Sequence, residues 1–432
     1  MIYDSNIEAF YATFNGYDFN SSVSKVLDVD TYSSPAVTVN NYKLARSDGE
    51  VVVNSTYGGK NITIKGRIKA SDRTELDNQI DIFKSYLSGH EKYLDLLING
   101  ITRRYIATVT NTSYTIRNGC VCLWEIEFTT SGFGYDTSTS SLTFGTYTAT
   151  ETSYANTIGG SYKTFPIIDM TINQVEPYWE AKYLQVKNSA TNQRIRITRT
   201  WNWYDRIVIN GNIKQVSLYP TTKTVISSMD SVTGWTSGHT LTADTVNMKE
   251  GVAALKVVMS SAATSTYIQS LDFSPTVNLS STSGKIILPV FIPTPTSGAI
   301  AKITLTLGSN TTLATNFVTF EQTTQWNGSA IATGAWNYFV FDMSETPAST
   351  NGTPIRTAIK SIKIMLSHGS NFQLNGALFD YMTINKPSAT PQYIDYEGTF
   401  TDLEIGTTTL LFEDEFTNRN ISITGNYTKR YL

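Results

Sequence analysis

The sequence has few charged residues, cysteines and histidines for its length. Charged residues make up 16% of the 432 residues, and the net charge is only −3. Ordinary soluble domains carry about a quarter charged residues. Such a chain lacks the positive field that would attract nucleic acids or anionic membranes. The two cysteines, Cys120 and Cys122, exclude a disulfide scaffold and are too few for a four-cysteine zinc site.

Long hydrophobic runs and export signals are also absent. The longest apolar run, residues 286–293, is too short to cross a bilayer and contains two prolines. The first ten residues show neither the basic segment nor the apolar core of a secretory signal. We therefore expect synthesis in a cytoplasm and no membrane insertion, which does not exclude later release by lysis of a host cell.

Signatures of catalysis are missing as well. His90, His239 and His368 have no partner at metal-ligand spacing, and no nucleophile-elbow, zinc-protease or phosphate-loop motif occurs. The neighbouring carboxylates Glu413 and Asp414 could in principle serve a glycosidase, but acidic clusters at strand ends are more often solvated. We predict that the chain is not an enzyme.

What the chain does contain is a series of β patterns interrupted by one helical pattern. Residues 61–70 alternate apolar and polar side chains, which is typical of a half-buried strand. Residues 71–89 change to helical spacing, with Asp72 and Glu75 as a capping box and Gly89 as the stop. Asn-Gly pairs, which tolerate the positive φ of a tight turn, predict hairpins at 99–100, 118–119 and 210–211.

The β patterns fall into groups that differ in composition. A Thr- and Ser-rich stretch at about 225–386 has strand patterns of its own, which favours a separate β-sandwich. The C-terminal piece after it is too short to fold alone, so its strands should complete the sheet begun at 165–219. The stretch between would then be an insertion at a surface loop. The expected domains are 1–145, 146–221 together with 391–432, and an inserted domain at 222–390.

The first and last segments also resemble a known protein family. FNGYDFNS (14–21), LARSDGEVVV (44–53), the strand at 61–70 with its helix, and SGFGYD (131–136) resemble the N-terminal belt domain of siphophage distal tail (Dit) proteins. GTTTLLFED and ISITGNYTKRYL near the C-terminus resemble the closing strands of that family's galectin-like second domain. The resemblance implies an all-β fold and a ring, usually hexameric, in the virion. That ring joins the tail tube protein to the tail-associated and tail-fibre proteins of the adsorption apparatus.

The insertion is a departure from the minimal family. DSVTGW (230–235), MKEGVAALKV (248–257) and ALFDYMTI (377–384) resemble jelly-roll carbohydrate-binding modules, which implies a host cell-wall polysaccharide as a partner. Asp380 holds a position that in such modules often binds a structural calcium, with Asp230 or Glu250 as a second oxygen ligand. A hydrogen-bonded turn carboxylate is the alternative. No other cofactor is implied.

Sugar binding requires flat aromatic faces with hydrogen-bonding groups around them. Trp336 and Tyr338 alternate on one strand, so we expect at least one of them in the core. Trp326 lies in a polar, glycine-containing stretch and is the best candidate for an exposed platform. The further candidates are Tyr267, Phe372 and Tyr381.

Three functions remain open. The leading hypothesis is a virion ring component with an accessory domain that binds the host surface. A bacterial carbohydrate-binding or adhesin protein would predict a signal peptide. An accessory part of a glycoside hydrolase would predict two carboxylates about 5–10 Å apart in a cleft. A closed ring of six in solution would favour the first hypothesis, and a monomer would favour the other two.

Overall fold

The protein is described by a computed structural model. It covers residues 10–30, 34–42, 51–98, 100–145, 147, 149–175, 181–273, 276–280, 284–296, 298–416 and 419–432. Within these residues the chain forms antiparallel β-sheets and a single α-helix, which confirms the expected all-β class. Asn99 of the first expected hairpin and residues 44–50 of the LARSDGEVVV motif lie outside the described residues. No helix in the described ranges has the length and apolarity that a membrane crossing requires.

The first sheet is built almost entirely from the N-terminal third of the chain. Its strands are β1 (Tyr11–Phe14), β2 (Tyr17–Asp18), β3 (Ser24–Asp30), β6 (Lys60–Lys69), β7 (Lys92–Ile98), β8 (Ile101–Arg117), β9 (Val121–Thr130), β10 (Gly134–Tyr135) and β35 (Arg430–Tyr431). They pair in the order β2-β1-β7-β8-β9-β6-β3, with β10 joining β8 to the C-terminal β35. A separate hairpin consists of β4 (Val37–Tyr42) and β5 (Val51–Tyr57).

The helix α1 (Arg73–Tyr86) forms where the sequence predicts it. The Asp72 side chain accepts a hydrogen bond from the Glu75 backbone N–H at 2.9 Å, and the Glu75 carboxylate accepts one from the Ser71 N–H at 2.9 Å. These two bonds satisfy N–H groups at the start of the helix that have no partner within it. The buried face packs on the first sheet through Leu76, Ile80 and Phe83.

The alternation expected for the first sheet is largely confirmed. Apolar residues of β6 and β9 lie in the core, and Asn118 and Gly119 both have positive φ in the turn between β8 and β9. Positive φ at both residues is what the Asn-Gly pair tolerates, although the loop has three residues, 118–120, because Arg117 pairs with Val121. Cys122 is fully buried on β9, whereas Cys120 lies half-buried in that turn.

Two further sheets pack face to face and include the C-terminal strands. One contains β11 (Ser140–Leu142), β34 (Arg419–Tyr427), β13 (Pro166–Val175), β16 (Arg206–Asn210), β17 (Gln215–Tyr219) and β31 (Gln392–Tyr393), in that order. The other contains β12 (Glu151–Ile158), β33 (Gly406–Asp414), β14 (Lys182–Asn188), β15 (Arg194–Arg199) and β32 (Glu397–Gly398). Because β33 lies between β12 and β14 and β34 between β11 and β13, the C-terminal strands complete this sandwich as expected.

The intervening chain forms two more sheets. The first is ordered β18 (Thr221–Ser227), β30 (Met382–Pro387), β23 (Lys285–Ile292), β29 (Asn375–Phe379), β21 (Ala254–Val258) and β20 (Thr240–Asp244), with β26 (Ala335–Asp342) on β23. The second is ordered β19 (Thr236–Ser237), β22 (Ala263–Ser270), β28 (Ser361–Phe372), β24 (Lys302–Gly308), β25 (Phe317–Gln322) and β27 (Ser349–Asn351). We call the latter the six-stranded face sheet.

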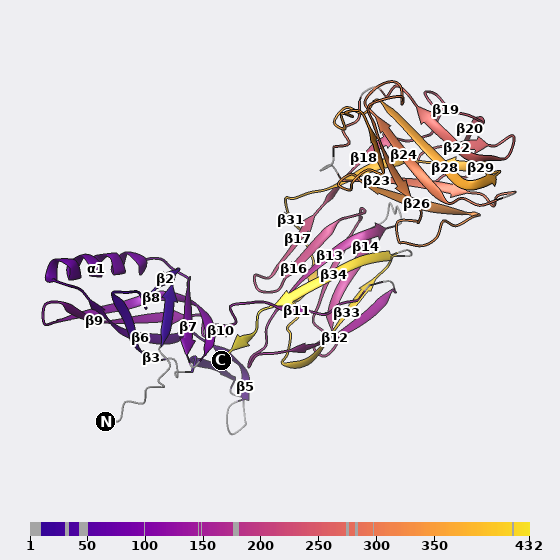
Figure 1. Ribbon diagram of the computed structural model, residues 1–432. Coiled ribbons are helices and arrows are strands. Elements are labelled where there is room, and N and C mark those ends of the chain that lie inside the picture. The colour runs from indigo at the N-terminus through magenta and orange to yellow at the C-terminus, as the bar shows by residue number, and fades with distance from the viewer. Residues whose placement is uncertain are drawn as a thin grey trace.

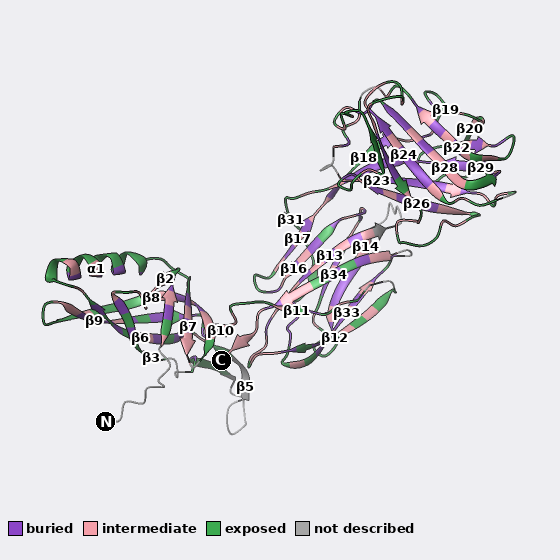
Figure 2. Cartoon of the chain, in the orientation of Figure 1, coloured by how far each residue is buried: buried purple, intermediate pink, exposed green. Residues whose placement is uncertain are grey.

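Three hydrophobic clusters hold these sheets together. The first lies within residues 12–128, the second joins 142–218 to 400–427, and the third lies within 226–384. We call the parts around them the first, second and inserted domains; their boundaries at 145, 221 and 390 remain a proposal. Figure 1 shows the three parts following one another along the molecule, and Figure 2 shows buried residues concentrated on the strands of these parts.

Two local expectations are wrong. The hairpin between β16 and β17 exists, but Asn210 pairs with Gln215, so its loop is the four residues 211–214 and not an Asn-Gly turn. Neither Trp336 nor Tyr338 is a core residue, because the buried side of β26 carries Asn337, Phe339 and Phe341. Both aromatic side chains lie half-buried on the other side of the strand.

Candidate functional site

The outer surface of the six-stranded face sheet combines an aromatic ring with many hydrogen-bonding groups. Residues opposite each other on antiparallel strands point to the same side of a sheet. One outward row across the sheet is Tyr267, Met365, Thr304 and Glu321. The next outward row is Gln269, Lys363, Thr306 and Thr319. The residues between these rows point inward and belong to the core of the inserted domain: Ile268, Ile364, Leu305 and Phe320.

Tyr267 is the aromatic centre of this surface. Its side chain is half-buried, and the Lys363 ammonium lies 4.2 Å from the ring centroid. The Ser237 hydroxyl donates to the Tyr267 backbone carbonyl at 2.6 Å, which ties the neighbouring β19 to this strand. A half-buried ring beside an ammonium group can contact the apolar side of a sugar while amide and ammonium groups nearby bind its hydroxyls.

Unsatisfied hydroxyls lie on the same surface. The Thr304 and Ser367 hydroxyl oxygens are buried and have no hydrogen-bond partner among the described residues. The Thr306 and Thr319 hydroxyls lie 3.3 Å apart, and Lys302 forms an ion pair with Glu321 at 2.7 Å. Buried polar groups normally have partners, but these two oxygens are closed to solvent, so the hydrogen-bonding groups that this surface offers are those of Gln269 and Lys363.

Trp326 does not have the exposed position expected of a platform. It is half-buried, and its ring centroid lies 5.7 Å from that of Trp203, a residue of the second domain. Trp203 also lies 5.7 Å from the ring of Tyr338, and Lys285 lies 4.8 Å from the ring of Tyr204. The surrounding ring contacts therefore give Trp326 a structural reason for its position at the seam between the two domains.

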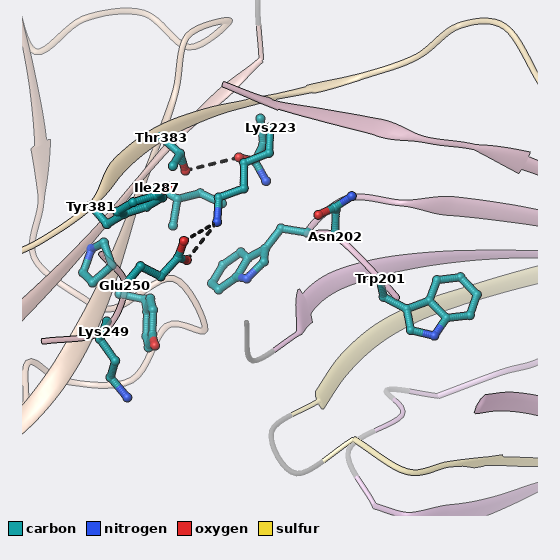
Figure 3. Close-up of a pocket in the computed structure, with 12 residues that line it drawn as sticks. Trp201, Asn202, Lys223, Lys249, Glu250, Ile287, Tyr381 and Thr383 are labelled. Carbon is teal, nitrogen blue, oxygen red and sulfur yellow. Dashed lines mark hydrogen bonds and ion pairs between the residues drawn. The ribbon is translucent and has the colours of Figure 1, made fainter. Parts of the chain in front are cut away.

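The pocket at this seam is small. It has a volume of about 50 Å³ and is lined by residues of both domains, among them Trp203, Tyr338 and Tyr381. Figure 3 shows Lys223 and Glu250 pointing toward one another beside Tyr381, and their charged atoms lie 2.6 Å apart. Ligand pockets are typically several hundred Å³, so this space is too small for a sugar. Tyr381 is thus at the seam and not on the face sheet.

Phe372 is a core residue, which corrects its assignment as a sugar platform. Its side chain is fully buried in the third hydrophobic cluster, at the end of β28. A stacking platform must expose one ring face, and this ring exposes none. Of the four aromatic candidates, only Tyr267 lies on the outward surface of the face sheet.

The three acidic candidates for calcium are near one another but already have partners. Asp380 accepts hydrogen bonds from the backbone of Lys249 and Glu250, and Asp230 accepts from the N–H groups of residues 252 and 253. Burial, together with the charges of Asp230 and Glu250, raises the pKa of Asp380 to about 6 against the opposing effect of the backbone hydrogen bonds from Lys249 and Glu250. One Asp380 oxygen has no partner, but Glu250 is bound to Lys223.

Among the described residues, no three acidic, histidine or cysteine side chains are grouped closely enough to hold a metal. The acids as placed therefore do not form a calcium site, and calcium binding stays a prediction from the resemblance.

The neighbouring carboxylates of β33 do not form a catalytic pair. Asp414 is buried and forms an ion pair with Arg419 at 2.8 Å. Glu413 accepts hydrogen bonds from the Tyr183 hydroxyl and the Gln185 amide, each at 2.8 Å. Successive strand residues point to opposite faces, so the two carboxylates cannot act on one bond.

Comparison with known sequences bears on the first domain. Residues 11–119 match the family described as "Phage tail protein RIFT-related domain". The first domain is similar to this family over those residues, and we call it the phage tail domain below. This match confirms, for that part of the chain, the resemblance seen in its sequence. No curated protein matches the chain.

Several solved structures share parts of the architecture at low similarity. The Dit protein of phage SPP1 is 13% identical, with a TM-score of 0.38 over 49% of this chain and 83% of that one. The phage P2 baseplate in its activated conformation with Ca is 11% identical, with a TM-score of 0.31 over 49% and 84%. The protein SGBP-B from a xyloglucan utilization locus in Bacteroides uniformis is 10% identical, with a TM-score of 0.24 over 76% and 96%. Scores this low carry no functional argument by themselves.

Two residues at the domain seams had no signal in the sequence. Trp203 lies in the second domain and alternates with Trp201 along the sequence. The residues next to it in the sequence do not indicate that it contacts the inserted domain. Arg430, two residues before the last residue of the sequence, lies among aromatic rings beside the phage tail domain. Both contacts join segments far apart in the chain, which a local pattern does not report.

Proposed function

We propose that this chain is a structural component of a long-tailed phage tail tip, whose phage tail domain assembles into a ring, most simply of six copies. The match of residues 11–119 to a phage tail family is the observation that carries this proposal. Identical subunits that meet through two different surfaces close into a ring when the rotation between them closes. Tail tube and tail-fibre proteins would then be its neighbours in the virion.

Mass in solution tests the assembly. Light scattering coupled to size exclusion should give about 290 kDa for six copies of the 47.8 kDa chain, and micrographs should show closed rings. A monomer at micromolar concentration, with no rings in the micrographs, would contradict the ring.

The inserted domain has a separate role in the proposal, as the part that binds a saccharide of the host surface. The outward surface of the face sheet supports it, because Tyr267 offers a ring and Gln269 and Lys363 offer hydrogen-bonding groups. An aromatic contact of this kind contributes about 0.5–1.5 kcal/mol beyond area burial. Several such sites on one ring would add by avidity.

Pull-down of the purified protein on host cell walls tests this site. Tyr267→Ala should weaken retention of the ring, with about a fivefold loss per site. Tyr393→Ala is the matched control, because Tyr393 is a 73% exposed tyrosine on β31 of the second domain. If the two variants bind equally well, the face sheet is not the saccharide site.

A further inference from the structure

A second cavity lies where the phage tail domain meets the second domain. It has a volume of about 520 Å³, within the range of small-molecule sites. Tyr93 and Arg104 line it from the first sheet, and Phe165, Asn212 and Arg430 line it from the second domain. The connecting segment 136–139 forms a further wall and adds three hydroxyl side chains.

The carboxylates around this cavity already form ion pairs with arginine or lysine side chains. Asp95 accepts two hydrogen bonds from Arg104, each at 2.7 Å. Asp136 forms ion pairs with Arg103 at 3.0 Å and with Lys429 at 3.5 Å. Bidentate and paired contacts of this kind satisfy a carboxylate, so neither acid is available to a further cation.

Arg430 has no such partner. Within the described part of the chain it forms no ion pair, and its Nε is a buried donor without an acceptor. Its guanidinium lies 4.0 Å from the ring of Phe133 and within 6 Å of those of Tyr135, Tyr162 and Phe165. The rings hold the side chain in place through cation–π contacts but leave its charge without a counter-ion.

A second cation beside the cavity, Lys214, also forms no ion pair with a carboxylate among the described residues. Lys214 lies 3.2 Å from the ring centroid of Phe165 and forms no ion pair within the described ranges. Burial lowers the pKa of Lys214, and the charges of Arg430 and Lys163 lower it further against the opposing effect of Asp402. Asp402 itself is paired with Lys163 at 2.6 Å. Within the described residues the seam therefore carries two cations, Arg430 and Lys214, that form no ion pair of their own.

We propose that this cavity is a second saccharide site, specific for an anionic sugar residue such as a uronic acid or a sugar phosphate. Arg430 binds the anionic group, as guanidinium groups do. The rings of Tyr93 and Phe165 contact the apolar side of the sugar, and Asn212 with the hydroxyls of 137–139 binds its hydroxyl groups. A neutral sugar would leave the two cations without a counter-ion, so the site discriminates by charge.

Titration of the intact protein with small probes tests the proposal. Glucuronic acid and glucose 6-phosphate should bind in the millimolar range at low salt, and glucose should bind at least tenfold more weakly. Inorganic phosphate separates a sugar site from a plain anion site. Equal affinity for glucose, or phosphate binding as tight as glucuronic acid, would overturn the proposal.

Variants at Ile213 locate the site without disturbing the fold. Ile213 is 64% exposed on the rim of the cavity, so neither Ile213→Asp nor Ile213→Lys removes core packing. Ile213→Asp should weaken glucuronic acid about tenfold by adding a negative charge, whereas Ile213→Lys should not weaken it. The control is Ile355→Asp, at a 59% exposed position of the inserted domain. Equal effects of Ile213→Asp and Ile355→Asp would contradict this location.

Tyr267→Ala separates this site from the one on the face sheet. That change should leave glucuronic acid binding to the cavity unchanged, because the two surfaces share no residue. If Tyr267→Ala removes all glucuronic acid binding and Ile213→Asp removes none, the anionic sugar binds the face sheet and the cavity proposal is wrong.

Discussion

Replacing Trp326 distinguishes a structural role at the seam from a role in sugar binding. The centroids of the Trp326 and Trp203 rings lie 5.7 Å apart in an edge-to-face arrangement. The backbone N–H of Trp326 donates to the backbone carbonyl of Tyr338 at 2.9 Å. Trp203 is only 8% exposed, so its burial depends on these neighbours. Trp326→Ala should therefore loosen the contact between the second and inserted domains and leave saccharide binding unchanged.

The expected magnitude follows from the burial of the ring. A fully buried Trp replaced by Ala costs about 3–5 kcal/mol, and a half-buried one roughly half of that. A loss of about 2 kcal/mol increases local opening of the seam about thirtyfold. Because the main-chain hydrogen bond survives in the variant, the effect is confined to the ring contacts.

Hydrogen exchange of the intact protein measures this opening. Peptides covering 199–206 and 323–340 should exchange faster in Trp326→Ala, while peptides of the phage tail domain should not change. Trp203→Ala alone and the double variant complete a cycle, and contacting side chains should show a coupling of about 0.5–3 kcal/mol. Unchanged exchange together with lost cell-wall binding would show that Trp326 is a sugar platform after all.

Three further predictions concern single residues. Burial raises the pKa of Asp205, which has no ion pair in the described chain, so its contribution to stability is complete below its unfolded pKa and is lost as pH rises through the raised value. Asp205→Asn replaces one of the two oxygens that accept hydrogen bonds from the Asn202 and Thr221 N–H groups by an NH2 group, so it should lower the melting temperature at pH 7 in circular dichroism. Gly66→Ala should unfold the first domain, because its Cβ would lie 2.1 Å from the Trp124 ring; circular dichroism and light scattering would show lost structure and lost assembly. Arg419→Met should cost about 3–5 kcal/mol in denaturant unfolding, since it leaves the buried Asp414 unpaired.

Residues whose role depends on neighbours in sequence were predictable. The alternation at Ile62, Ile64 and Ile68 reports burial of one strand face, and the capping residues Asp72 and Glu75 act within one helical turn. The pairing of the C-terminal strands could be inferred as well, since a short, apolar segment must find an existing sheet. In each case the physical requirement is local or concerns a whole segment.

Residues whose role depends on neighbours far away in the sequence were not predictable from the sequence. Trp326 lies in a polar stretch that favours exposure, yet a ring about 120 positions earlier covers it. Phe372 ends a long strand and is buried by the opposite sheet, which its own flanking residues do not indicate. The same limit applies to the outward rows of the face sheet, because the rows cross strands and exist only once the register is fixed.

The aromatic seams have a consequence for weak multivalent binding. Flexible linkers lower the effective concentration of a second site as their length grows, whereas a domain held in one orientation presents every copy of its surface at a fixed position. Here the inserted domain contacts the second domain through Trp203 and Trp326, and the second domain meets the phage tail domain through β35 and the rings around Arg430. If the ring forms, Tyr267 of each copy would face one fixed direction relative to the ring. Variants that loosen the first seam should therefore reduce binding of the whole ring to cell walls more than binding of free sugar, because they change the geometry between sites and leave each site intact.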